Sequence, residues 1–228
     1  MGFVIVLACT VVLAYLLRKP LAKAPVVFYA LGVALCVLYL MNVYGSLPRP
    51  VMEAMFLLMQ KCTLALALFT VVMFIGVFRK DSKVGLAMRP VRAELSILAC
   101  ILTAGHMIVY LMAFLPRISA GTADGQTLFF LATALVLLLL VLILGITSFR
   151  EVKRRMNAGT WKRVQRWAYV FFGLIYVHMM SILLPSALKG ASTATVSIIV
   201  YTVLFALYAV LRIRRALLDR RDEGGRRA

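Results

Sequence analysis

The stretch MRPVRAELSILACILTAGHMIVYL, residues 88–111, decides the fold of this chain. A basic cluster is followed by an apolar run long enough to cross about 30 Å of hydrocarbon as a helix. His106 stands near the middle of that run. Because an ionisable side chain is costly to bury in a membrane, it usually has a function and a partner. The chain has one other histidine, His178, which lies midway along a second apolar run.

The rest of the chain is composed like this stretch. Its residues are 64% hydrophobic with a mean hydropathy of +0.98, whereas soluble domains are roughly 45–50% apolar. The prolines fall at or near the ends of apolar runs, as helix breakers do. The sequence therefore predicts an all-α integral membrane protein, a bundle of about seven transmembrane helices. We place the spans near 2–17, 26–44, 54–78, 94–115, 127–148, 167–185 and 194–212.

Basic residues orient the predicted bundle. Of the 26 lysines and arginines, 22 follow the first, third, fifth and seventh spans. The others are Arg49, Lys61, Arg117 and Lys189. Since cytoplasmic loops are rich in lysine and arginine, we expect an outside N-terminus and a cytoplasmic C-terminus in a bacterial cytoplasmic membrane. The net charge of +18 does not indicate nucleic-acid binding, because the basic residues lie between spans and no soluble domain presents them.

Other cofactor motifs are missing from the sequence. The four cysteines lie inside apolar runs without a C-x-x-C pair, so no disulfide framework, zinc site or iron–sulfur site is predicted. There is no glycine-rich loop of the kind that binds nucleotides. A nicotinamide or flavin donor would therefore be bound by another polypeptide.

The two histidines lie at matching depths. His106 and His178 come twelve and eleven residues after the predicted cytoplasmic ends of their spans, which places both about 17–18 Å deep. The iron of a b-type haem takes one imidazole from each side, so matched depth favours this ligand. Gly105 and Gly173 would let a macrocycle or a backbone approach, and Thr103, Ser181 or backbone carbonyls would hold the imidazole N–H groups. The alternative is that each histidine only makes an interhelical hydrogen bond.

Residues 88–111 and the stretch TSFREVKRRMNAGTWKRVQRWAYVFFGLIYVHM, residues 147–179, resemble the two haem-bearing signatures of the ferric-reductase-like transmembrane family. That family includes NADPH oxidases, ferric reductases and the haem-binding membrane subunit of methionine sulfoxide reductase. The resemblance implies a haem-binding core over residues 79–185. Three helices precede it in residues 1–78, and the last helix and a basic cytoplasmic tail follow in residues 186–228.

The chain departs from the family pattern at the cytoplasmic side. Full members carry a second histidine on each helix, but the corresponding residues here are Arg92 and Gln165, which are not normal haem ligands. The resemblance therefore implies one haem b, held by His106 and His178. A flavin or quinone near Arg92, Gln165 and Trp167 would then act as a second carrier, or quinol would be the donor. Lys61 or Arg117 would neutralise the haem propionates; alternatively Lys61 extends to the interface.

These features favour a membrane b-type cytochrome subunit that passes single electrons to an extracytoplasmic acceptor through a partner reductase or flavoprotein. No catalytic residue is predicted, because the chain contains no soluble substrate domain. The alternative is a haem-free scaffold or assembly subunit of a redox complex. A transporter is disfavoured, because transport requires polar or broken helices near the midplane and the fifth span offers only Thr133 and Gly145.

Overall fold

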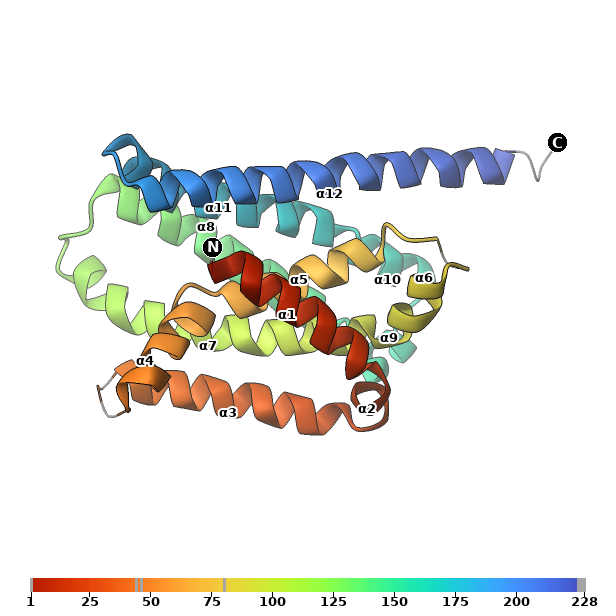
Figure 1. Ribbon diagram of the computed structural model, residues 1–228, viewed down its shortest axis with the longest axis horizontal. Coiled ribbons are helices and arrows are strands. Elements are labelled where there is room, and N and C mark those ends of the chain that lie inside the picture. Colours follow the sequence, from red (N-terminus) through yellow and green to blue (C-terminus); the bar gives the residue numbers. More distant parts are fainter. Residues whose placement is uncertain (1, 44, 46, 80, 225–228) are drawn as a thin grey trace.

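The computed structural model describes residues 2–43, 45, 47–79 and 81–224, with side chains to residue 220. Those residues form helices and connections without a strand. Figure 1 shows the long helices lying side by side and alternating in direction. They are α1 (Gly2–Leu16), α3 (Pro25–Val43), α5 (Thr63–Ile75), α7 (Arg92–Ser119), α8 (Gly125–Ile146), α11 (Trp167–Leu188) and α12 (Ser192–Gly224).

Short helices lie at the two ends of the bundle. Figure 1 shows four of them at the end where α1, α5 and α8 finish: α2 (Arg18–Lys23), α6 (Lys83–Met88), α9 (Arg150–Arg155) and α10 (Ala158–Gln165). At the opposite end α4 (Arg49–Met55) follows α3. The basic connections thus share one end, as the alternation of charge along the sequence requires.

The all-helical membrane class is confirmed. Among the described residues, five helices are long and apolar enough to cross a membrane, and a sixth span results if the bent pair Arg49–Gln60 and Thr63–Ile75 is counted as one. The first predicted span forms a shorter apolar helix, α1, of 15 residues. Exposed apolar side chains such as Val26 and Leu188 give the bundle a surface suited to lipid. The count of seven spans and their orientation stay predictions.

The third predicted span is broken where its sequence becomes polar, at Gln60 and Lys61. The π-helix η1 (Phe56–Gln60) precedes the break, and the two halves meet at 43°. Cys62 adopts a left-handed conformation with φ of 52°, which is uncommon for a residue with a side chain. The Thr63 hydroxyl donates to the Leu57 carbonyl at 2.6 Å and satisfies one freed backbone group.

Small residues bring the helices around α7 close together. A Cβ on Gly105 would lie 2.5 Å from the Cys36 sulfur on α3, and one on Gly145 of α8 would lie 2.8 Å from the Cys100 sulfur. Close backbone approach is the usual basis of packing between membrane helices. Gly105 thus accommodates the close approach of α3, one of the two alternatives that the sequence left open. The space around Gly173 is open.

Several helix ends differ from the sequence prediction. Pro116 and Pro185 lie inside the last turns of α7 and α11, where a missing N–H removes only one helical hydrogen bond. The arginine-rich tail continues α12 as one helix that extends past the rest of the bundle (Figure 1). At the start of α8 the Asp124 side chain caps the helix by accepting from the Thr127 N–H at 2.8 Å.

An ion pair joins the start of α7 to α9. The Glu94 carboxylate, whose side chain is 4% exposed, lies 2.7 Å from the guanidinium of Arg150, which is 70% exposed. The hydrogen bond to this carboxylate raises the pKa of Arg150 above its ordinary value. The pair fixes a basic helix to the core at the end where the short helices gather.

Candidate functional site

His106 is held by the break in the third span. Its Nδ1 lies 3.0 Å from the backbone carbonyl oxygen of Met59, in η1. A carbonyl only accepts, so Nδ1 carries the proton and Nε2 has a free lone pair. In an unbroken α-helix the Met59 carbonyl would accept from the Thr63 N–H; here it accepts from the Cys62 N–H at 3.0 Å and from the imidazole.

His178 is held by the neighbouring helix α8. Its Nδ1 lies 3.0 Å from the Thr133 hydroxyl oxygen. That hydroxyl donates its one proton to the Phe130 carbonyl at 2.8 Å, so it accepts from the imidazole N–H. The Nε2 of His178 is therefore also unprotonated. Both histidines present a free Nε2, the form in which imidazole binds a metal.

Met59 supplies a backbone carbonyl, one of the partners that the sequence left open, whereas Thr133 was not expected. The Thr103 hydroxyl donates to the Ala99 carbonyl, and the Ser181 hydroxyl donates to the backbone carbonyl of His178, so neither holds an imidazole N–H. Serine and threonine in helices commonly bond back to their own helix in this way. Thr133 lies inside the fifth predicted span, where polar side chains are rare. That position could have marked it as a candidate hydrogen-bond partner.

Aromatic side chains connect the surroundings of the two histidines. The ring centroids of His106 and Tyr110 lie 4.6 Å apart, and Phe114 follows at 6.0 Å from Tyr110. These residues are four apart on α7 and so share one face. Phe114 packs edge-on against Phe130 of α8 at 5.3 Å, and the Phe130 carbonyl accepts from the threonine that holds His178.

The bundle brings the two histidines into one region. Helices α7 and α11 both pack against α8. No three histidine, cysteine, aspartate or glutamate side chains gather into a metal site among the described residues. Two imidazoles are nevertheless sufficient for haem iron, since the macrocycle supplies the remaining four nitrogens.

The two predicted propionate partners contact aromatic rings. The Lys61 Nζ lies 4.8 Å from the Phe56 ring centroid, and the Arg117 guanidinium carbon lies 5.7 Å from that of Phe114. Both cations are exposed and make no salt bridge within the described part of the chain. Arg117 therefore ends the aromatic row that begins at His106, whereas Lys61 lies beside the helix break. A contact of either with propionates stays a prediction.

Arg92, at one of the two positions where the family pattern has a second histidine, lies in basic surroundings. Arg92 lines a cavity of about 160 Å³ together with Arg89, Arg212 and Arg215. Gln165 donates to the Thr147 hydroxyl at 2.9 Å, and Trp167 is exposed. Sites for drug-sized ligands occupy about 300–1,000 Å³, so this cavity does not fit a haem or a flavin ring. That Arg92 and Gln165 hold no haem stays a prediction from the sequence.

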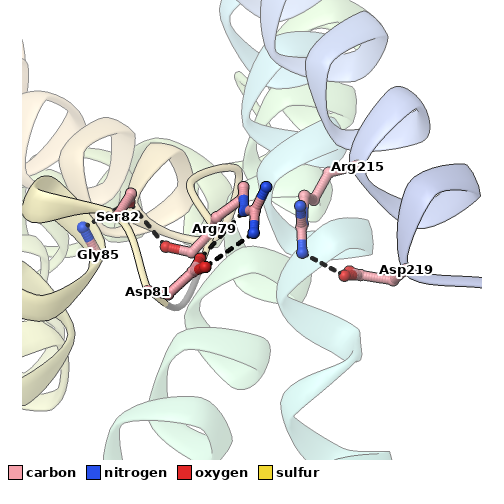
Figure 2. Close-up of polar contacts among 6 residues, drawn as sticks. All are labelled: Arg79, Asp81, Ser82, Gly85, Arg215 and Asp219. Carbon is pink, nitrogen blue, oxygen red and sulfur yellow. Dashed lines mark hydrogen bonds and ion pairs between the residues drawn. The ribbon is translucent and has the colours of Figure 1, made fainter. Parts of the chain in front are cut away.

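Two ion pairs lie beside this cavity. Arg79 contacts Asp81 through two hydrogen bonds of 3.0 and 2.7 Å, and Arg215 contacts Asp219 at 2.5 Å. Figure 2 shows the two pairs next to each other, with Ser82 capping α6 through the Gly85 N–H. The bonds from Arg79 hold the pKa of Asp81 below its usual range. The acidic groups here are thus already paired, and the cavity keeps a positive lining.

Comparison with known proteins identifies the fold family. The profile of the family described as "Ferric reductase like transmembrane component" matches residues 61–176, a range that includes His106 and ends two residues before His178. A protein of Treponema pallidum (strain Nichols), described only as uncharacterized, is 50% identical over 157 residues, which are 68% of this chain and 43% of that protein. No solved structure matches. The chain therefore belongs to the ferric-reductase-like transmembrane family.

Proposed function

We propose that this chain is a membrane b-type cytochrome subunit with one haem b between the Nε2 atoms of His106 and His178. The carrying observation is that each Nδ1 is bonded to an oxygen, Met59 O or Thr133 Oγ1. The carbonyl can only accept, and the Thr133 hydroxyl accepts when its proton is directed to Phe130 O. Such outer partners fix the tautomer and the ring orientation of metal-binding histidines. The donor set thus fits haem iron.

A bound haem supplies one-electron redox chemistry. The protein's own residues orient the two imidazoles, and the apolar helices keep water from the ligands. The aromatic row from Tyr110 to Phe114 leads from His106 toward Arg117. We propose that electrons leave at this end of the bundle, to an extracytoplasmic acceptor on a partner reductase or flavoprotein. The activity of the whole protein belongs to the same proposal, because the relative is more than twice as long as the matched segment.

The same two hydrogen bonds support one alternative, a haem-free scaffold of a redox complex. Each imidazole already has a partner on another helical segment, so each is satisfied as an interhelical contact without a ligand. The two proposals differ in what the unprotonated Nε2 atoms do. A scaffold leaves both without a ligand, whereas a cytochrome uses both.

Haem content distinguishes the two proposals. We expect the purified chain to give a low-spin reduced-minus-oxidised spectrum and one haem per chain in a pyridine haemochrome assay. His106→Ala or His178→Ala should abolish that spectrum, whereas Gln165→Ala should leave it intact. Absence of haem would favour the scaffold, and two haems per chain would overturn the single-site assignment.

A further inference from the structure

We propose that the basic cavity lined by Arg92 binds the phosphate of an anionic phospholipid headgroup. The lining residues come from the adjoining ends of α5, α7 and α11 and from the part of α12 that passes them. This is the end of the bundle at which the basic connections gather (Figure 1). The charge pattern of the sequence predicts that this end faces the cytoplasm.

The positive charge of this cavity is not balanced by the protein. Four arginines line it, Arg89, Arg92, Arg212 and Arg215, but only one carboxylate, that of Asp219. Asp219 pairs with Arg215. The other three arginines form no ion pair among the described residues. Because like charges held together repel, such a cluster favours a bound anion.

Arg92 has the fewest contacts of these cations. Its side chain is partly buried in the first turn of α7, and within the described part of the chain it makes neither a hydrogen bond nor an ion pair. A Cβ on Gly76 would lie 4.0 Å from Arg92 Nη2, and Gly76 also lines the cavity. The guanidinium therefore reaches the end of α5 beside this space. A charge withdrawn from water without a partner is costly, and a ligand anion would remove that cost.

Two neighbouring arginines are held in place by neutral acceptors. Arg89 Nη2 donates to the Phe78 carbonyl at 2.7 Å, and Arg212 Nε donates to the Tyr169 hydroxyl at 2.9 Å. Each contact orients a guanidinium and leaves its charge and its other N–H groups for a ligand. Paired N–H groups of arginine match the oxygens of a phosphate. The Tyr169 hydroxyl, which also lines the cavity, keeps its own proton for a ligand oxygen.

The surroundings favour a lipid as the source of the phosphate. The cavity, at about 160 Å³, is below the range of drug-sized sites, so only a small part of a ligand enters it. Trp167 and Tyr169 are exposed at the start of α11, and such aromatic side chains commonly lie at the level of the headgroups. Exposed Val170 and Val210 on α11 and α12 offer apolar surface to acyl chains. Basic pockets between membrane helices on the cytoplasmic side bind anionic headgroups in this way.

Lipid binding is measured on the purified full chain in a neutral detergent. The chain is titrated with phosphatidylglycerol, phosphatidylcholine or inorganic phosphate, and native mass spectrometry counts the molecules bound. We expect the first phosphatidylglycerol to bind more tightly than phosphatidylcholine, whose headgroup carries its own cation. Arg92→Gln and Arg212→Gln should each weaken this step about 10-fold, because a charge-assisted hydrogen bond is lost. Arg163→Gln, which removes an exposed arginine of α10 at the same end, is the matched control and should bind like the unmodified chain.

The control and the two other ligands decide between the possible outcomes. Weaker phosphatidylglycerol binding in Arg92→Gln and Arg212→Gln but not in Arg163→Gln supports the site. Equal weakening in all three variants would show general attraction to a basic surface and overturn it, as would equal affinity for the two lipids. Inorganic phosphate that binds more tightly than phosphatidylglycerol, with the same dependence on Arg92, would overturn the lipid as the ligand. If Arg92→Gln does not fold, Arg212→Gln still decides the result.

The lipid site is independent of the proposed cytochrome. None of these measurements requires bound haem, so they decide the site whether or not the chain carries one.

Discussion

Thr133 and His178 are 45 residues apart in the sequence, and their side chains meet at 3.0 Å between α8 and α11. The threonine hydroxyl donates a hydrogen bond to the Phe130 carbonyl. With its proton used there, the hydroxyl accepts from the imidazole N–H. In the proposed cytochrome this contact would leave the Nε2 of His178 available to the haem iron.

Thr133→Val should weaken haem binding while the bundle stays folded. Valine keeps the shape but removes the acceptor for the imidazole N–H, and loss of such an outer partner lowers metal affinity about 10–100-fold. Haem titration of the apoprotein, followed by absorbance, measures the change. Thr133→Ser should restore most of the affinity. Thr195→Val, which removes an exposed hydroxyl bonded to the Ala191 carbonyl just before α12, should have no effect, and an equal loss there would contradict the assigned role.

The left-handed backbone at Cys62 should reject β-branched residues. Cys62→Val should lower the free energy of unfolding by about 2 kcal/mol, because a branched Cβ crowds the carbonyl in this conformation. Glycine adopts it without a steric cost, so Cys62→Gly should be the milder change. Thermal unfolding in detergent measures both. Cys9→Val, at an exposed position on α1, is the control, and equal effects at the two cysteines would refute strain at the break.

Periodicity and hydropathy predicted the long helices, because burying a backbone in lipid leaves few alternatives to an α-helix. The two histidines were also found from the sequence, since ionisable residues are rare in such runs. The ends of the spans were less accurate. Helix α7 continues to Ser119 and α12 to Gly224, because hydropathy marks where the apolar stretch ends and not where the helical hydrogen bonds end.

The partners of the histidines were not predictable in the same way. Met59 offers a backbone carbonyl, and no residue type marks a free carbonyl. It becomes available only because η1 and Cys62 break the helix, which hydropathy does not detect. Thr103 and Ser181 were expected from their spacing along the same helices, but a hydroxyl in a helix bonds first to the carbonyl one turn earlier. Contacts between different helices depend on rotation and register, which one sequence does not fix.

Arg150→Ala should destabilise the chain more than Arg154→Ala. Arg150→Ala leaves the buried Glu94 carboxylate without its cation. The other oxygen of this carboxylate already has no hydrogen-bond partner among the described residues. Arg154→Ala breaks an exposed pair with Glu151 on the same short helix, and such a pair contributes little. We expect the Tm to fall by a few degrees in Arg150→Ala and to be nearly unchanged in Arg154→Ala. The added substitution Glu94→Gln should recover part of the loss; no recovery would argue against the pair.

Reporter fusions test the predicted orientation. Alkaline phosphatase is active only outside the cytoplasm, so a fusion after Ala228 should be inactive. A fusion after Gly121, in the turn between α7 and α8, should be active because few basic residues lie at that end. Matched fusions to a cytoplasmic reporter should give the opposite pattern. Activity after Ala228 would refute a cytoplasmic C-terminus, and with it the combination of an outside N-terminus and seven spans.

The side from which the haem is oxidised tests the proposed direction of electron flow. His106 is linked through Tyr110 and Phe114 to Arg117, at the end of α7 that the charge pattern places outside. The opposite end carries arginines, and neither of the two histidines lies there. A membrane-impermeant oxidant should therefore oxidise pre-reduced haem quickly from outside in sealed right-side-out vesicles. In inverted vesicles the same oxidant should act slowly, and Phe114→Leu should slow the outside reaction if the aromatic row carries it. Rapid oxidation only in inverted vesicles would place the acceptor on the cytoplasmic side.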